Sequence, residues 1–396
     1  MSEIIEVDVE LGGRMLHAAD LFPPRRPGAT FMFRYTPGYL ADANAYPFAP
    51  QLPLTRGSFP GLGGLPGPMQ DGAPDRWGRL IVGRRIGRNP KADDLLLGVS
   101  DHTRQGALRY RRGSTEYQHP DSQTPPLVDL AQLQKAADSV AADNDDNEAY
   151  KLLLEMGSDA LGGARPKAAV SRGDELWMAK FTQTTDQWSV IEWESVMLKL
   201  AARAGIIVPR NELVHIGARA VLLSRRFDRA NDGTRIGYIS VMTFMGVQDG
   251  DHLDYVDLAA DMAAFTDAPA AQLRQLFRRV VFSLAVNNTD DHGRNHGFLR
   301  SRAGWQLSPA FDINPNPNTA APRSTSIDGE RHRLPGFDAL MASANAFRLD
   351  PGEAREVAHE VARAVADWRE LVPAEIGAAQ RHDFEQVLDW LPDLLA

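Results

Sequence analysis

The sequence predicts an α+β protein with a small β-rich N-terminal domain and a two-part core whose second part is helical. Apolar and polar residues alternate in residues 4–36, which is the period of half-buried strands. Further strand-like runs lie between residues 168 and 223, around one helical stretch, and helical spacing dominates beyond residue 255. We therefore expect a domain at 1–112, a linker at 113–147, a small lobe at 148–230 and an all-helical lobe at 231–396.

Composition narrows the functional classes. A chain of 396 residues can hold two or three domains and a substantial core. Lys and Arg total 43 against 52 Asp and Glu, with no dense basic tract, which disfavours direct nucleic-acid binding. The absence of cysteine excludes disulfides and thiolate chemistry. The N-terminus lacks signal-peptide features and no apolar run approaches ~18 residues, so we expect a cytoplasmic protein without membrane contact.

The first domain offers no nucleotide site. The glycine-rich run 61–67 invites comparison with a dinucleotide-binding loop, but Pro66 stands where the third glycine belongs and no convincing strand precedes the run. In chain order we expect strands within 4–36 around a turn at Gly12-Gly13, a loop at 46–75, a helix from Asp75 to about Arg88, and a linker with an exposed helix at 112–147.

Phosphate-binding features open the second half. Gly162 and Gly163 precede Lys167 and a strand, so backbone N–H groups could approach a phosphate while Lys167 adds charge. A glycine pair before a strand is more often simply a turn. Lys180 lies in the apolar strand 176–181. Lysines at strand ends are generally solvated, but one on a strand behind a glycine loop can reach the α- and β-phosphates of a nucleotide.

The predicted helix 187–205 carries a carboxylate on its apolar stripe. Glu194 falls among the apolar residues, where a charge is costly unless it is paired, and Lys180 is the natural partner. The alternative is a glutamate at the edge of the stripe that reaches solvent. The apolar stripe contains Val190, Ile191, Met197, Leu198, Ala201 and Ala204, and the expected polar face contains Glu192, Ser195, Lys199 and Arg203.

The polar stretch Asn287–Asn295 follows an apolar helical pattern and is the strongest functional signal. Asp290, Asn295 and then Asp312 give the order of groups that phosphoryl transfer requires: one orients a hydroxyl and two hold magnesium. Such residues also form ordinary solvated turns, but apolar segments on both sides favour a loop held against a core.

Other elements of the second half are less informative. Residues 316–335, rich in Asn, Pro, Arg and Ser, are expected to be mobile. We expect strands at 212–216 and 220–223, and helices at 255–266, 272–286, 352–372 and 382–395.

These segments together resemble the HipA-like serine/threonine protein kinases, the toxin components of bacterial HipBA toxin–antitoxin modules. The resemblance lies in residues 162–167, 226–229, 288–299 and 307–315, with support in the first domain at 33–35, 52–54 and 75–78.

The resemblance implies a role for each residue. Asp290 would be the catalytic aspartate, with His292 near the transferring phosphoryl group, and Asn295 and Asp312 would bind Mg²⁺. Lys180 would bind the phosphates of ATP. Gly162, Gly163 and Lys167 would also contact the phosphates, and Glu194 would act indirectly by pairing with Lys180. The backbone at Arg226 and Phe227 would hold the adenine.

The family resemblance also implies partners and a reaction. Such proteins transfer the γ-phosphate of ATP to Ser or Thr hydroxyls of a protein such as a translation factor or an aminoacyl-tRNA synthetase. A small helix-turn-helix antitoxin neutralises them, so DNA is contacted only indirectly. The sequence departs from the family pattern at two positions. Arg225 stands just before residues 226–229, where the family often has Glu. Ala160 stands where some members phosphorylate a serine of their own, so self-phosphorylation here would use Ser158 or be absent.

Two other readings stay open. A nucleotide-binding regulatory partner of an antitoxin, with little turnover, would have no need for Asp290, Asn295 and Asp312 together. A hydrolytic metal site of Asp290, His292, His296 and Asp312 is chemically possible. That site would explain neither Lys180 nor Glu194, so it ranks last.

Overall fold

The computed structural model describes residues 3–11, 13–26, 29–87, 90–113, 115–118, 130–142, 146–155 and 165–396. The chain forms two compact units: unit 1 contains Met1–Thr184 and His215–Gln248, and unit 2 contains Thr185–Val214 and Asp249–Ala396. Antiparallel sheets and helices are both present, so the α+β prediction is confirmed. The domain boundaries expected at residues 112, 147 and 230 remain predictions.

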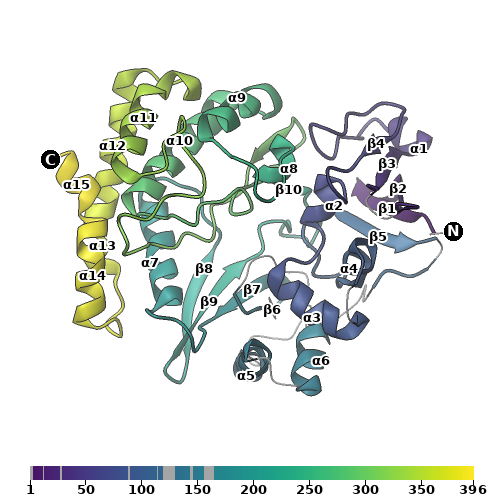
Figure 1. The fold of residues 1–396 in the computed structure, drawn as a ribbon, viewed down its shortest axis with the longest axis horizontal. Helices are drawn as coiled ribbons and strands as arrows, with labels where there is room; N and C mark the ends of the chain where they lie inside the picture. The colour runs from purple at the N-terminus through teal and green to yellow at the C-terminus, as the bar shows by residue number, and fades with distance from the viewer. Residues whose placement is uncertain are drawn as a thin grey trace. The chain divides into compact units, whose positions relative to one another are not determined.

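Unit 1 begins with a five-stranded sheet in the order β4-β3-β2-β1-β5, with antiparallel neighbours (Figure 1). The alternation predicted for the first strand is confirmed, because Ile5, Val7 and Val9 are fully buried. The strands are β1 (Ile5–Leu11), β2 (Arg14–Phe22), β3 (Met32–Tyr35), β4 (Phe59–Pro60) and β5 (Leu108–Arg112).

The connections between β3, β4 and β5 contain four short helices in the described residues. The predicted helix after Asp75 is present as α3 (Arg76–Ile86), and Arg88 lies outside the described residues. Two short elements, β4 and α2, interrupt the stretch 46–75, for which the sequence predicts a loop. The other helices here are α1 (Pro37–Leu40), α2 (Gly67–Asp71) and α4 (Ala92–Gly98).

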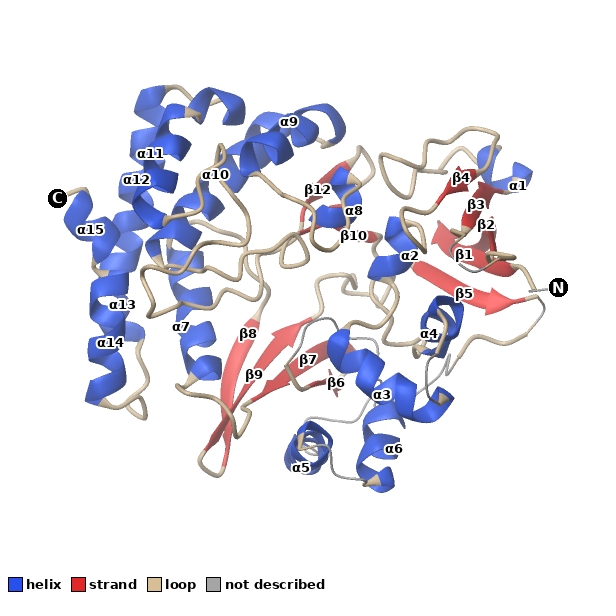
Figure 2. Cartoon of the chain, in the orientation of Figure 1, coloured by secondary structure: helices blue, strands red, loops and turns tan. Residues whose placement is uncertain are grey.

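A second antiparallel sheet in unit 1 contains β6 (Lys167–Arg172), β7 (Glu175–Phe181) and β9 (Arg219–Arg225), in the order β6-β7-β9 (Figure 2). These strands confirm the strand-like runs of the sequence. Strand β8 (Asn211–Ile216) precedes β9 and is joined to it by a short turn; its last two residues, His215 and Ile216, belong to unit 1. Beyond β9 come β10 (Tyr238–Ser240) and α8 (Val241–Met245).

The helix expected to be exposed within residues 112–147 is α5 (Leu130–Ala141), and that expectation of exposure is wrong. Leu133, Ala137 and Val140 recur at helical spacing and are almost completely buried. Arg219 of β9 donates to Asp138 at 2.9 Å, which ties α5 to the second sheet. The next helix, α6 (Asn147–Glu155), packs against α5.

Unit 2 is mainly helical, and in Figure 1 the helices α9, α11 and α12 surround α10. Two predicted helices are confirmed as α9 and α10, whereas 352–372 and 382–395 are each interrupted, at Asp367 and Asp389. The helices are α7 (Val190–Arg203), α9 (Tyr255–Phe265), α10 (Pro269–Ala285), α11 (Arg333–Ala342), α12 (Pro351–Ala366), α13 (Trp368–Leu371), α14 (Ala378–Leu388) and α15 (Trp390–Leu394), with a 3₁₀ helix at Ala344–Phe347.

Unit 2 also contains a short antiparallel hairpin, β11 (Gly297–Arg300) and β12 (Trp305–Leu307), so the expectation of an all-helical lobe at 231–396 is wrong in this part. Within the described ranges, no helix combines the length and apolarity that crossing a bilayer requires.

Helix α7 corrects one prediction. Glu192 and Ser195, expected on the solvent face, are buried, while Lys199 on that face is exposed. The spacing of polar residues therefore overestimates the exposed part of this helix, against which α12 and α13 pack. Trp193, fully buried, has its ring centroid 4.3 Å from that of Phe384.

Candidate active site

Helix α10 delivers the loop Asn287–Asn295 to the site. Its predicted apolar face is confirmed, because Leu273, Phe277, Val280 and Leu284 are fully buried. The buried Arg333 donates to the carbonyl oxygens of Leu284, at 2.8 Å, and Ala285. A cation at this position satisfies carbonyls that have no partner within the helix and complements the negative end of its dipole.

A bend at Asn287 directs the chain out of the helix. Asn287 has a left-handed backbone, with φ of 50°. Its side-chain amide donates to the carbonyl oxygens of Asn316 at 2.7 Å and Asn318 at 3.1 Å, and its own carbonyl accepts from the Asn316 amide at 3.1 Å. The loop is therefore tied at its start to a segment about thirty residues later.

The three predicted catalytic-loop residues lie together. The Asp290 carboxyl group is exposed, and its Oδ1 is 3.9 Å from Nε2 of His292. Asn295 donates its amide N–H to the backbone oxygen of Asp290 at 2.8 Å. Because the amide nitrogen is used in this way, the Asn295 side-chain oxygen is the atom left for a cation.

Electrostatics connect Asp290 with Asp312. Partial desolvation raises the pKa of Asp290, and the negative charges of Asp312 and Asp291 act in the same direction, against the lowering effect of His292. Asp312 has φ of 57°, and its Oδ1 accepts from the Asn314 amide at 3.1 Å. Carboxylate and amide oxygens are the ligands that Mg²⁺ prefers. A raised carboxyl pKa is typical of functional sites.

Asp291, the neighbour of Asp290, is a buried anchor that the sequence analysis missed. It is 1% exposed and accepts hydrogen bonds from Ser283 Oγ at 2.7 Å, Arg323 at 2.5 Å and the Tyr255 hydroxyl. His296 Nε2 lies 2.6 Å from its other oxygen. Although burial alone would raise the pKa of Asp291, these neighbours hold it well below the ordinary value.

The segment 316–335 is held against this loop, so the prediction of mobility is wrong. Arg323, 2% exposed, also donates to the Asn288 carbonyl at 3.2 Å. The Ser324 amide donates to the Thr289 carbonyl at 2.9 Å, and the Thr325 hydroxyl donates to the backbone oxygen of Asp291. Local composition indicated a loop, but the buried arginine finds its carboxylate 32 residues away, which no local pattern reveals.

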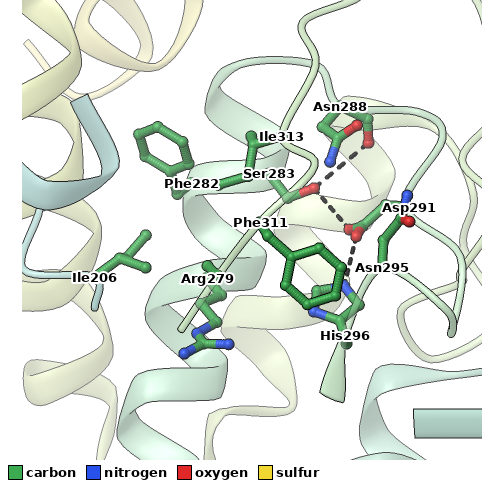
Figure 3. A pocket seen from close by; sticks show the side chains of 11 residues that line it. Ile206, Arg279, Phe282, Ser283, Asn288, Asp291, Asn295, His296, Phe311 and Ile313 are labelled. Atoms are coloured by element: carbon green, nitrogen blue, oxygen red, sulfur yellow. Dashed lines mark hydrogen bonds and ion pairs between the residues drawn. The ribbon is translucent and has the colours of Figure 1, made fainter. Parts of the chain in front are cut away.

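A small pocket lies behind the loop (Figure 3). One end contains the Asp291–His296 pair and the other contains Arg279 of α10. Apolar side chains around them come from α10, from residues 310–313 and from the chain that follows α7. The lining residues are Ile206, Arg279, Phe282, Ser283, Asn288, Asp291, Asn295, His296, Ala310, Phe311 and Ile313.

The predicted phosphate-binding lysines belong to unit 1. Lys167 of β6 and Lys180 of β7 are partners in the antiparallel register, and both are buried. The indole N–H of Trp77 donates to the Lys167 carbonyl at 3.2 Å. Glu194 of α7 belongs to unit 2 and is 2% exposed, as expected for the apolar side of that helix. Lys180 belongs to unit 1, and the pairing of Glu194 with Lys180 remains a prediction.

Other predicted nucleotide contacts are less defined. The Arg226 side chain makes two hydrogen bonds to Asp228, at 2.7 and 2.6 Å, and one to the Thr103 carbonyl at 3.0 Å, so it is engaged within unit 1. The Phe227 ring centroid is 6.1 Å from that of Tyr238. The prediction concerns the backbone at Arg226 and Phe227 and stays a prediction. Gly162, Gly163, Ser158 and Ala160 lie outside the described residues.

A second group of potential metal ligands, Glu6, Asp8 and His17, lies on the first sheet of unit 1. Arg111 forms ion pairs with Glu6, at 2.8 Å, and with Asp8, at 3.0 Å. Since the guanidinium of Arg111 already pairs with both carboxylates, this group is a salt-bridge cluster.

Comparison with known proteins identifies relatives. Residues 160–368 match the HipA-like C-terminal domain family. The chain is 25% identical over 315 residues to the Sinorhizobium fredii protein named "Putative kinase Y4mE", covering 71% of each chain. It is also 25% identical over 141 residues to the Shewanella oneidensis "Serine/threonine-protein kinase toxin HipA", covering 30% of this chain and 33% of that protein.

A solved structure shares the fold over nearly the whole chain. It is the complex of the Shewanella oneidensis MR-1 toxin–antitoxin system HipA, HipB and its operator DNA, with a TM-score of 0.74. The matching chain is 17% identical, and the match covers 99% of this chain and 96% of that chain.

Proposed function

Because this chain belongs to the HipA-like family, we propose that it is an ATP- and Mg²⁺-dependent serine/threonine protein kinase and the toxin of a toxin–antitoxin pair. The observation that carries the proposal is the arrangement in unit 2. Asp290 is presented to solvent by a loop anchored through the buried Asp291, and the charge of Asp312 acts on it.

Asp290 would orient the attacking hydroxyl group and accept its proton. Its raised pKa suits proton acceptance, because a carboxylate with a higher pKa is a stronger base. His292, with its ring nitrogen 3.9 Å from Asp290, would lie beside the transferring phosphoryl group and add positive charge when protonated.

The metal-binding role falls to Asn295 and Asp312. Both offer oxygen atoms, and the hydrogen bond from the Asn295 amide nitrogen to the Asp290 backbone fixes which atom Asn295 would offer. Bound Mg²⁺ would neutralise the charge that develops on the phosphates during transfer. The carboxylate of Asp312 and the amide oxygen of Asn295 therefore fit the ion chemically.

In unit 1, Lys180 and Lys167 would bind the phosphates of ATP with the backbone of Gly162 and Gly163, and Glu194 would orient Lys180. The backbone at Arg226 and Phe227 would hold the adenine. By family resemblance, the substrate would be a cytoplasmic protein such as a translation factor or an aminoacyl-tRNA synthetase. A small helix-turn-helix antitoxin would be the partner and would provide the only link to DNA.

The test is transfer of radiolabel from ATP in an extract of the host cells, with magnesium and purified protein. The comparison is between the unchanged protein, Asp290→Asn and a control, Asp383→Asn, an exposed aspartate of α14. We expect a labelled protein band that is lost only with Asp290→Asn. Full labelling by Asp290→Asn would contradict the role of Asp290. Tight magnesium-dependent ATP binding without any labelling would favour a regulatory nucleotide-binding protein.

A further inference from the structure

Arg279 carries a buried positive charge for which the described residues provide too few partners. The residue is 5% exposed, and one of its nitrogens donates to the Ser308 carbonyl at 2.6 Å. Its other two guanidinium nitrogens, Nε and Nη1, are buried and have no hydrogen-bond partner among the described residues. Buried N–H groups of this kind are rare in native proteins and require a partner.

The charge of Arg279 is also uncompensated. No carboxylate in the described part of the chain forms an ion pair with it, although burial lowers its pKa only to about 10, so it stays protonated at neutral pH. Asp291 lines the same pocket, but Arg323 already pairs with that carboxylate at 2.5 Å, and His296 lies 2.6 Å from it. A buried cation without a counter-charge is costly, so a negative group is expected beside it.

Two other buried arginines of unit 2 show how such charges are normally satisfied. Arg323 pairs with Asp291 at 2.5 Å. Arg333 reaches the carbonyls of Leu284 and Val387 and lies over the Trp390 ring, with its guanidinium carbon 4.1 Å from the ring centroid. Arg279 has a single carbonyl as its partner, so it differs from both.

The pocket limits what the missing partner can be. The pocket is small, because the centre of a water-sized group can occupy only about 20 Å³ of it. Phosphate, sulfate and organic carboxylates are polyatomic and larger than a water-sized group, so a monatomic anion suits the pocket better. A water molecule would fit and would accept hydrogen bonds, but it would leave the charge of Arg279 uncompensated. A monatomic anion accepts hydrogen bonds and also compensates the charge.

We propose that this pocket binds a chloride ion at Arg279, between α10 and the segment that leads into Asp312. The Arg279 N–H groups would donate to the ion while the third nitrogen keeps its bond to Ser308. Because Ser308 begins the run Ser308-Pro309-Ala310-Phe311-Asp312, the ion would help to hold that run against α10.

The first test compares thermal unfolding in sodium chloride, sodium bromide and sodium gluconate at equal ionic strength. Gluconate is too large for the pocket and controls for general salt screening. We expect the unfolding midpoint to rise with chloride or bromide and then to saturate, because a ligand that binds only the folded state stabilises it. The difference between halide and gluconate should vanish in Arg279→Met and persist in Arg274→Met, a partly exposed arginine of the same helix that pairs with Glu353 and Glu356.

An equal halide effect in Arg279→Met and the unchanged protein would overturn the proposal, as would the lack of any halide effect. If Arg279→Met does not fold, crystals of the unchanged protein in bromide decide the question. An anomalous peak within hydrogen-bond distance of Arg279 Nε or Nη1 supports the site, and an ordered water there without anomalous signal overturns it. Neither measurement uses phosphoryl transfer, so the outcome is independent of the proposed kinase activity.

Discussion

Replacing Arg323 by methionine tests the anchor behind the candidate catalytic loop. Methionine keeps a long unbranched side chain but removes the charge and three hydrogen bonds, to Asp291 at 2.5 Å, Ser283 at 3.0 Å and the Asn288 carbonyl at 3.2 Å. Removing one partner of a buried ion pair costs about 3–5 kcal/mol, because the other charge is left uncompensated.

Two features place the expected loss near the lower end of that range, at about 3 kcal/mol. His296 remains 2.6 Å from Asp291 and still provides partial compensation. In addition, the buried Nε of Arg323 has no hydrogen-bond partner among the described residues, so its removal relieves a small cost.

Hydrogen exchange measured by mass spectrometry is the suitable assay, since it reports on unit 2 without requiring that both units unfold together. A local loss of about 3 kcal/mol corresponds to roughly a hundredfold faster exchange in peptides covering 287–295 and 316–331. The matched control is Arg331→Met, at an exposed arginine of the same segment whose side chain donates to the Arg323 carbonyl at 2.7 Å. If Arg323→Met exchanged no faster than Arg331→Met in these peptides, the buried pair would not be the anchor.

Three further changes are informative. Asp312→Asn should weaken magnesium-dependent ATP binding at least tenfold, roughly the loss of one charge-assisted contact; calorimetry giving an unchanged affinity would count against the ligand role. Asp291, with a folded-state pKa below its unfolded value of about 3.8, contributes stability that is complete above that pH and lost as the pH falls below it. Acid titration of Asp291→Asn should therefore show a shallower loss of unfolding free energy than the unchanged protein. Gly61→Ala would place a Cβ 2.2 Å from the Gly64 carbonyl oxygen. The free energy of unfolding, measured in urea, should therefore fall by about 1–3 kcal/mol. An unaltered urea midpoint would contradict this close contact.

Local pattern was sufficient for the element that presents the loop. The apolar spacing of Leu273, Phe277, Val280 and Leu284 predicts α10, and these four residues form its buried face. Because α10 ends at Ala285, the polar loop begins near Asn287, as the sequence predicts. Sequence spacing therefore placed Asp290 and Asn295 in one loop of unit 2.

The partners of Asp291 could not be predicted in the same way. They come from α9, α10 and a segment after Asp312, at separations of 36 residues for Tyr255, 8 for Ser283 and 32 for Arg323. Whether a polar residue such as Asp291 is buried depends on these tertiary contacts. The signal in the sequence was the pair of adjacent aspartates, of which Asp290 is exposed and Asp291 is buried.

Facing predictions failed where an element is covered on several sides. In α7, Glu192 and Ser195 fit a polar face by spacing, yet both are buried, and α12 and α13 pack against this helix. In α5, the expectation of an exposed helix came from the proline-rich and acidic flanks, although Leu133 and Val140 already share one face. Amphipathic spacing indicates which face is apolar, but only tertiary packing determines how much of the remainder is covered.

The backbone adds a distinction between the two ends of the site. Asn287 and Asp312 both have left-handed backbone conformations, which are unfavourable for residues other than glycine although Asn and Asp tolerate them best. At Asn287 the side chain explains the choice, because its amide makes two hydrogen bonds that glycine could not make. At Asp312 glycine would likewise ease the bend, but it would remove the charge that helps to raise the pKa of Asp290. The strain at Asn287 therefore serves the structure of the loop, and the strain at Asp312 is best explained by a need for its carboxylate at this bend.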